Sequence, residues 1–167
     1  IQAEGITLIE LVPVLLQELL THARTLPAPE RSLPDLEWAM VTGEAVPVPV
    51  VNLWLDTYPD VRVVNAYGPT EAADDTCQHV LSAKLPADRR SVPIGTPIPN
   101  MTHYVLDAQL NLVPIGVPGE ICVSGVGVGL GYWQDEKHTR DRFVLNPHRP
   151  EGTAGEHHAV LYRTGDR

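Results

Sequence analysis

Residues 61–71, VRVVNAYGPTE, join an apolar, strand-like run to a tight turn that carries an aromatic ring, a hydroxyl and a carboxylate. Tyr67 offers a flat face on which a heterocycle can stack, and Gly68 lets a ligand approach the backbone closely. The Thr70 hydroxyl can donate to a phosphate oxygen, and Glu71 can hold Mg²⁺, which prefers carboxylate oxygens and substrate phosphates. A plain Gly–Pro turn with an exposed acid after a strand explains the same residues equally well.

The chain before this stretch alternates between helical and strand-like segments. Apolar residues recur at helical spacing within residues 6–24, and residues 36–41 form a short apolar run that ends in Thr42–Gly43–Glu44. Residues 47–58 predict a second helix and residues 61–66 a second strand. This alternation favours an α/β fold with a parallel sheet, in which ligands gather beyond the carboxyl ends of the strands.

The second half changes character near Pro93, where prolines begin to separate short apolar runs. We predict a parallel-sheet α/β subdomain over residues 1–92 and a small β-rich subdomain, a distorted barrel, over residues 93–167. The expected elements of the second part are strands at residues 103–106, 120–124 and 160–163 and a short polar helix at residues 134–142.

Composition narrows the class of protein. The apolar fraction of 43% in 167 residues is typical of one globular domain, and the formal charge of −9 argues against a nucleic-acid surface. The lysines are Lys84 and Lys137, so a lysine-centred mechanism has few candidates. Cys77 and Cys122 do not suggest a disulfide framework, which favours a reducing compartment. Because the chain starts at Ile1 rather than at Met, we expect a fragment of a larger protein.

Three further motifs have a functional and a structural interpretation. In YRTGDR, residues 162–167, Asp166 can accept hydrogen bonds from ribose hydroxyls or can stabilise its own turn. The glycines of GVGVGLGYW, residues 125–133, lack the spacing of phosphate-binding loops, so we interpret them as structural, with Tyr132 and Trp133 packing. The histidines 148, 157 and 158 do not have zinc-site spacing and fit a solvated loop.

Taken in order, five segments resemble the adenylation domains of nonribosomal peptide synthetases, within the superfamily that includes acyl-CoA ligases and luciferases. The resemblance covers nearly the whole chain. Its motifs are LEWAMVTGEA (36–45), NAYGPTEA (65–72), VPIGTPIPNMTHYVLD (92–107), GEICVSGVGVGLGYW (119–133) and YRTGDR (162–167).

The resemblance implies an ATP site and a reaction. Ala66 and Tyr67 would contact adenine beside Gly68, Thr70 would touch the α-phosphate, Glu71 would bind Mg²⁺ and Asp166 would hold the ribose. Thr70 and Glu71 are thus the implied catalytic residues. An amino-acid carboxylate would attack ATP to give aminoacyl-AMP and pyrophosphate, with transfer to a phosphopantetheine thiol on a carrier protein. The implied setting is a cytoplasmic multidomain synthetase with carrier and condensation domains.

Two family features lie outside this sequence. The phosphate loop would precede Ile1, and the mobile lid with the catalytic lysine would follow Arg167; neither Lys84 nor Lys137 matches the setting of that lysine. We therefore expect the isolated chain to be inactive and at most to bind nucleotide weakly.

The resemblance also implies a substrate pocket. Its positions would be Glu10, Met40, Thr42, Gly43, Ala66, Asp74 and Asp75. Three acids around one pocket repel one another unless a cation compensates, so we hypothesise a basic amino acid such as ornithine or lysine, paired with Glu10 and Asp75. The alternative is that Asp74 and Asp75 cap a turn while Glu10 faces solvent.

Two other functions remain open at this point. An acyl- or aryl-CoA ligase would keep the superfamily and change the substrate. A non-catalytic α/β-plus-barrel binding module would keep only the fold, and ATP would then leave the environments of Tyr67 and of the tryptophans unchanged.

Overall fold

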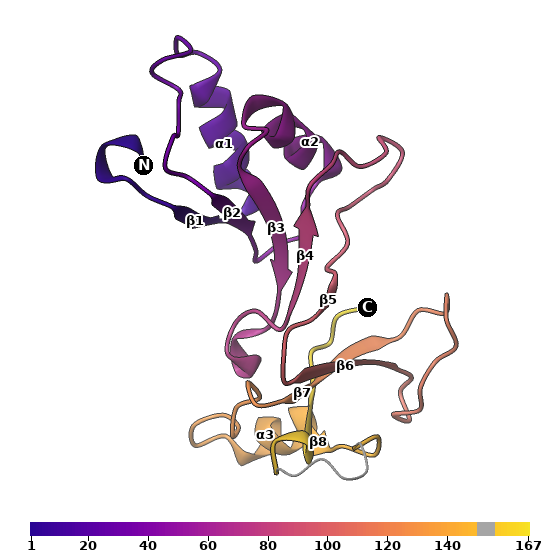
Figure 1. Cartoon of the computed structure of the whole chain (residues 1–167). Helices are drawn as coiled ribbons and strands as arrows, with labels where there is room; N and C mark the ends of the chain where they lie inside the picture. Colours follow the sequence, from indigo (N-terminus) through magenta and orange to yellow (C-terminus); the bar gives the residue numbers. More distant parts are fainter. Residues whose placement is uncertain (150–155) are drawn as a thin grey trace. The chain divides into compact units, whose positions relative to one another are not determined.

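The computed structural model describes residues 1–149 and 156–167, with only the backbone of Glu156 (Figure 1). Contacts divide the chain into two compact units. The first contains Ile1–Tyr67 and Gln78–Thr96, and the second contains Gly68–Cys77 and Pro97–Arg167. The second unit therefore also takes residues 68–77, whereas the domain boundary that we expect from the sequence is a single one, after residue 92; that boundary stays a prediction.

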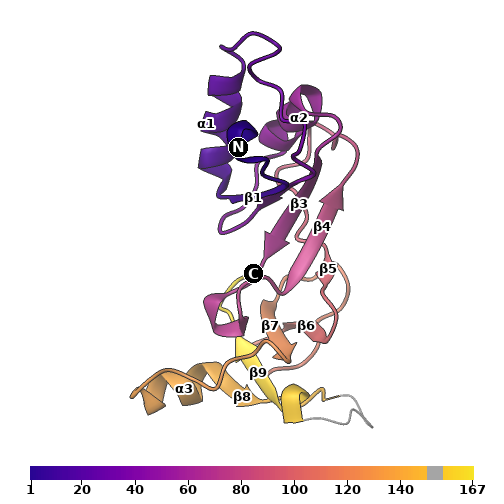
Figure 2. The ribbon, with the colours of Figure 1, turned by 60° about the vertical axis from the view of Figure 1, so that its left-hand side comes forward.

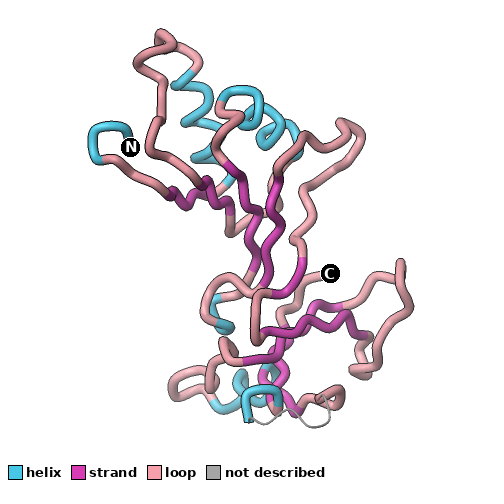
Figure 3. Tube along the Cα trace, viewed as in Figure 1, coloured by secondary structure: helices cyan, strands magenta, loops and turns pink. Residues whose placement is uncertain are grey.

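Parallel strands and two helices build the first unit, as the alternating pattern predicts. Strand β1 (Leu8–Leu11) pairs with β2 (Trp38–Val41), and β2 pairs with β3 (Arg62–Tyr67), all in parallel. Figures 2 and 3 show these strands beside the helices. The remaining elements are η1 (Gln2–Glu4), α1 (Pro13–Ala23), α2 (Val48–Thr57), β4 (Cys77–Leu81) and β5 (Thr96–Pro97), and the sheet order is β1-β2-β3-β4-β5.

The core of this unit lies between the helices and one face of the sheet. Leu16 and Leu20 of α1, Trp54 of α2, and Val41 and Val63 of the sheet are all fully buried. Burying side chains of this size stabilises the fold by about 1.5–3 kcal/mol each.

Residues 6–24 are helical over most of their length, as predicted, but their first part forms a strand that was not predicted. Residues Leu8–Leu11 form β1, and α1 begins only at Pro13, in its first turn. Proline fits there because the first turn of a helix leaves its N–H groups without intrahelical partners. Strand β1 forms its backbone hydrogen bonds with β2. The spacing of apolar residues within one segment does not reveal such pairing with a distant segment.

An open antiparallel sheet, rather than a closed barrel, organises the described part of the second unit. Its order is β6-β7-β9-β8. The strands are β6 (Met101–Leu106), β7 (Glu120–Gly125), β8 (Phe143–Leu145) and β9 (Val160–Arg163), and the helical elements are η2 (Thr70–Ala72), α3 (Glu136–Arg142) and η3 (Glu156–His158). The prediction of a β-rich second part is confirmed, but its strands do not form the predicted barrel.

Within the described residues, no helix has both the length and the apolar character needed to cross a membrane.

Candidate functional site

The segment that follows β3 folds into a tight turn that leads into η2. A Cβ atom at Gly68 would lie 1.7 Å from the carbonyl oxygen of Asp74, so the turn closes only with glycine at this position. Ala73 and Asp74 adopt left-handed backbone angles, with φ of 59° and 72°. Such angles are costly for non-glycine residues and are concentrated at functional sites.

Glu71, the predicted Mg²⁺ ligand, is held on both its side chain and its backbone. The Tyr132 hydroxyl donates to Glu71 Oε1 over 2.6 Å, and the Gly129 N–H donates to the Glu71 carbonyl oxygen over 2.8 Å. The hydrogen bond from Tyr132 is the main cause that holds the pKa of the Glu71 carboxyl below its usual value, and the positive charge of Arg142 acts in the same direction. The carboxylate is therefore ionised at neutral pH.

Aromatic rings support the tyrosine that reaches Glu71. The Tyr132 ring packs edge-on against Phe143, with centroids 5.5 Å apart, and Phe143 packs against Tyr162 at 4.9 Å. The Tyr132 and Tyr162 hydroxyl oxygens lie 3.3 Å apart. Burial, followed by the hydrogen bond with Tyr132, raises the pKa of Tyr162, so its hydroxyl stays protonated.

A hollow of about 570 Å³ opens beside this cluster within the second unit. Its lining consists of Thr70, Glu71, Ala73, Gly127, Gly129, Gly131, Tyr132, Trp133 and Phe143. The structure thus brings two predicted site residues, Thr70 and Glu71, to one concave surface with an ionised carboxylate at its wall.

The glycine segment lines this hollow because its backbone lies close against η2. A Cβ at Gly127 would lie 2.7 Å from the Ala72 carbonyl oxygen, and one at Gly129 would lie 3.1 Å from that of Glu71. These contacts agree with the structural interpretation of the glycines. The predicted packing of Trp133 is wrong, because this residue is 89% exposed.

Asp166 lies in a loop that is fixed at several points. Thr164 Oγ1 accepts the Asp166 N–H at 3.0 Å, and the Asp166 carbonyl oxygen accepts the Ile121 N–H at 2.8 Å. The buried carboxylate of Glu120 holds Arg163 Nη2 at 2.7 Å and the Gly165 N–H at 3.1 Å. The loop is thus braced by backbone and by Glu120, while the Asp166 residue itself is exposed.

Three predicted pocket residues share a face of the first sheet. Glu10 pairs in register with Met40, and Met40 pairs with Val64. Because side chains alternate along a strand, Ala66, two residues after Val64, lies on the same face. This face is opposite the one that α1 and α2 cover, and Glu10 is exposed on it.

The remaining predicted pocket residues are divided between the units. Thr42 and Gly43 follow β2 in the first unit, where the Thr42 N–H donates to the Leu11 carbonyl oxygen over 3.2 Å. Asp74 and Asp75 belong to the second unit, as do Gly68 and Asp166, while Tyr67 ends β3 in the first. The convergence of these groups on one site is a proposal.

Sequence reasoning missed the roles of Tyr132, Tyr162 and Glu120. Tyr132 lies 61 positions from its partner Glu71, and Glu120 lies 43 positions from Arg163. No local spacing rule connects residues so far apart. The sequence signals are that Tyr132 was expected to pack, as it does against Phe143, and that Tyr162 falls inside the motif noted for Asp166.

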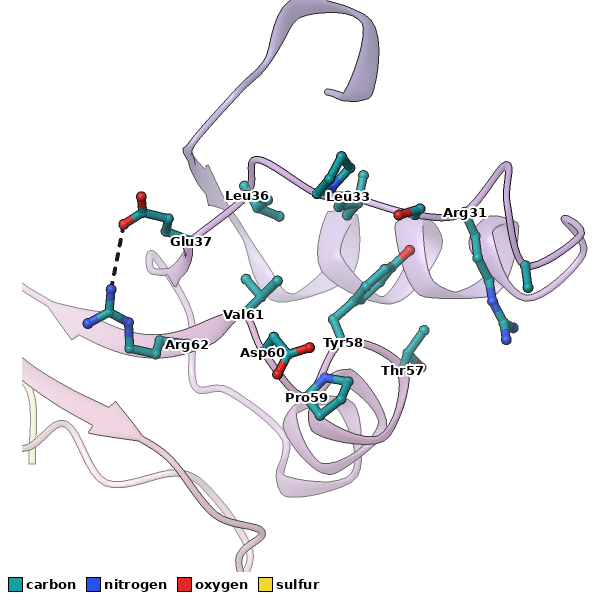
Figure 4. Close-up of a pocket in the computed structure, with 13 residues that line it drawn as sticks. Arg31, Leu33, Leu36, Glu37, Thr57, Tyr58, Pro59, Asp60, Val61 and Arg62 are labelled. Carbon is teal, nitrogen blue, oxygen red and sulfur yellow. Dashed lines mark ion pairs between the residues drawn. The ribbon is translucent and has the colours of Figure 1, made fainter.

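A second hollow, of about 600 Å³, lies in the first unit (Figure 4). Figure 4 shows Tyr58, Pro59 and Asp60 on one side, and Glu37 paired with Arg62, whose atoms Oε2 and Nη2 are 3.6 Å apart. These residues lie at or near the amino ends of β2 and β3. Ligands of open α/β sheets bind beyond the carboxyl ends of the strands, so we do not include this hollow in the candidate site.

One histidine, His148, and both cysteines have structural roles. His148 Nε2 lies 2.8 Å from the Leu110 carbonyl oxygen, and the His158 carbonyl oxygen accepts a hydrogen bond from Asn146. Burial raises the pKa of Cys77 and of Cys122 to about 11, which keeps both thiols protonated and unreactive.

Comparison with known families gives a direct match. The model of the family described as "AMP-binding enzyme" matches residues 1–133. Tyrocidine synthase 1 of Brevibacillus parabrevis is 39% identical over 164 residues, which is 96% of this chain and 13% of that protein. Bacitracin synthase 3 of Bacillus licheniformis is 35% identical over 167 residues, which is 99% of this chain and 2% of that protein.

Solved structures agree with the sequence comparison. The nonribosomal peptide synthetase FmoA3 matches with a TM-score of 0.85 and 32% identity, over 98% of this chain and 16% of that one. A nonribosomal peptide synthetase protein containing adenylation and PCP domains matches with a TM-score of 0.81 and 29% identity, over 98% of this chain and 26% of that one.

The chain thus spans a small part of the length of each of these relatives. The family match covers most of its residues and includes the turn that carries Thr70 and Glu71. The chain belongs to the AMP-binding enzyme family.

Proposed function

We propose that this chain is part of an adenylation domain that activates an amino acid with ATP. The substrate carboxylate attacks the α-phosphorus of ATP, and the products are aminoacyl-AMP and pyrophosphate. The aminoacyl group then passes to the phosphopantetheine thiol of a carrier protein. The observation that carries the proposal is the concave surface where Thr70 and the ionised Glu71 lie together, within a segment that the family model matches.

The residues around this surface suit phosphate chemistry. Thr70 is exposed, and its hydroxyl can donate to an α-phosphate oxygen. Glu71 would hold Mg²⁺, since this cation typically takes one or two protein carboxylates and completes its shell with phosphate oxygens and water. Mg²⁺ would neutralise charge on the phosphates. Glu71 contributes an ionised carboxylate whose direction is set by Tyr132, which fits the needs of such a ligand.

The nucleoside would be bound by two other segments. Ala66 and Tyr67, at the end of β3, would contact the adenine, and Gly68 lets the ligand approach the backbone. The Asp166 carboxylate would accept the ribose hydroxyls. The braced loop around Asp166 supports this role, because a carboxylate on a fixed loop loses little entropy on binding.

For the substrate, we favour a basic amino acid. Glu10 is exposed on the sheet face that also carries Met40 and Ala66, so the carboxylate is accessible to a ligand. A substrate ammonium would compensate Glu10 and Asp75, with Asp74, Thr42 and Gly43 completing the pocket.

The proposed partners follow from the chemistry and from the relatives. One structural neighbour contains adenylation and PCP domains, which supports a carrier domain as a partner here, in a synthetase that also has condensation domains. Transfer to a thiol suits a reducing compartment, and the two free buried cysteines fit the cytoplasm.

ATP–pyrophosphate exchange by the complete adenylation domain that carries this chain tests the proposal. Exchange that depends on amino acid, with ornithine or lysine preferred, is the expected result. A clear preference for an apolar amino acid would end the basic-substrate hypothesis. Activity only with fatty or aryl acids and coenzyme A would indicate an acyl-CoA ligase, and no exchange with any acid would indicate a binding module.

A further inference from the structure

We propose that Tyr132, supported by Tyr162, is a positioning residue that orients the Glu71 carboxylate toward a divalent cation. The inference rests on the proposed function, which makes Glu71 a cation ligand. It concerns two side chains that act on the cation through Glu71.

The geometry defines a directed hydrogen-bond chain. A tyrosine hydroxyl has one proton, and that of Tyr132 is donated to Glu71 Oε1 over 2.6 Å. With that proton committed to Glu71, Tyr162 is the donor in the 3.3 Å contact between the two hydroxyls, and its hydroxyl also interacts with the Glu71 carboxylate. Each donor polarises the next, so the hydrogen bond to Glu71 is stronger than that of an isolated tyrosine.

The two tyrosines are themselves held in place. Phe143 packs against both of their rings, with centroid distances of 5.5 Å to Tyr132 and 4.9 Å to Tyr162. Tyr162 is 4% exposed and belongs to β9, which pairs with β7 and β8. The Tyr132 N–H is bonded to Thr139 Oγ1 at 2.9 Å. The hydroxyl that meets Glu71 is therefore fixed by the sheet and by α3.

A carboxylate on a 3₁₀ turn has rotatable bonds of its own, and a hydrogen bond at Oε1 removes much of that freedom. Outer partners of this kind orient metal ligands, and their loss typically weakens metal affinity by about 10- to 100-fold. A purely structural role, in which Tyr132 only ties the glycine segment to η2, would change stability and leave cation binding unchanged.

The test compares Tyr132→Phe with a matched control in the complete adenylation domain. Tyr104→Phe also removes a single tyrosine hydroxyl in the second unit, one that donates to the His148 carbonyl oxygen over 3.2 Å. Electron paramagnetic resonance measures Mn²⁺ binding in the presence of a non-hydrolysable ATP analogue. Mg²⁺ titration of pyrophosphate exchange gives the half-saturating cation concentration.

We expect Tyr132→Phe to weaken Mn²⁺ binding and raise the half-saturating Mg²⁺ concentration by about tenfold, with the KM for the amino acid unchanged. Tyr162→Phe should have a smaller effect in the same direction, because Tyr132 still donates to Glu71 in that variant. Tyr104→Phe should leave cation dependence unchanged.

The failures can be told apart. If the wild-type domain exchanges pyrophosphate and Tyr132→Phe has wild-type cation dependence, with or without a lower melting temperature, the inference is overturned and the proposed function stands. If the wild-type domain shows no Mg²⁺-dependent exchange, the proposed function is wrong, and so is this inference.

Discussion

The Glu120 carboxylate binds Arg163 Nη2 at 2.7 Å and, with its other oxygen, accepts the Gly165 N–H at 3.1 Å. One buried side chain therefore joins the start of β7 to the loop that carries Asp166. The Arg163 side chain is only partly exposed, and its Nε atom is buried with no hydrogen-bond partner among the described residues. We therefore expect Glu120 to hold the loop that carries Asp166 in place.

Replacing Glu120 by glutamine should therefore destabilise the second unit and loosen the proposed ribose site. Loss of a hydrogen bond to a charged group typically costs about 1.5–3 kcal/mol, and Arg163 would lose its carboxylate partner. We expect a lower thermal unfolding midpoint and a higher KM for ATP in exchange assays of the complete domain. Glu136→Gln is the matched control, because Glu136 pairs with Arg140 at the exposed surface, where such pairs contribute little. Equal midpoints for the two variants would contradict this role.

Substitution of Gly68 by alanine measures how tightly the turn before η2 is closed. An alanine Cβ would lie 1.7 Å from the Asp74 carbonyl oxygen, so the backbone must shift. We expect Gly68→Ala to lower the free energy of unfolding by about 2–3 kcal/mol, measured by denaturant titration.

Gly116→Ala provides the comparison. Gly116 has a φ of +87°, but a Cβ there would meet no atom within 4 Å. Backbone strain alone should cost about 1 kcal/mol. If Gly68→Ala costs no more than Gly116→Ala, the close approach of the turn to Asp74 is not the constraint that we infer.

His103 should make the second unit sensitive to acid. Burial lowers the pKa of His103 from its usual 6.5, and its Nε2 atom hydrogen-bonds with Thr76 Oγ1 at 2.9 Å. The folded state favours the neutral ring, so this contribution to stability is fully present above the unfolded pKa and is lost as the pH falls toward the folded one. The unfolding midpoint of His103→Gln should fall less than that of wild type between pH 7 and pH 5. In terms of the free energy of unfolding, the slopes of the two proteins against pH can differ by about 1.4 kcal/mol per pH unit. That is the value for the uptake of one proton.

The sequence predicted the regular elements of the first unit because local patterns specify them. Trp38–Val41, Val48–Thr57 and Arg62–Tyr67 agree with the predicted strand, helix and strand within a few residues. Parallel pairing followed from their alternation. The short strands β1, β4 and β8 escaped prediction, since each is defined by pairing with distant residues rather than by its own spacing.

The candidate site was predictable where a motif is contiguous and not where it depends on tertiary contacts. Thr70 and Glu71 were identified from a turn after a strand. Tyr132 reaches Glu71 only because the glycine segment lies close against η2, as the short Cβ distances at Gly127 and Gly129 demonstrate. Spacing in the sequence carries no information on such contacts.

The most direct measurement of the central claim is the Mg²⁺-dependent ATP–pyrophosphate exchange rate of Glu71→Gln in the complete domain. Glutamine keeps an oxygen that can accept the Tyr132 hydrogen bond and removes the charge that would bind the cation. We predict a loss of exchange of about 100-fold or more, with an unfolding midpoint close to that of wild type. Glu18→Gln, on the exposed face of α1, should exchange normally. Wild-type exchange by Glu71→Gln, with unchanged Mg²⁺ dependence, would contradict the account.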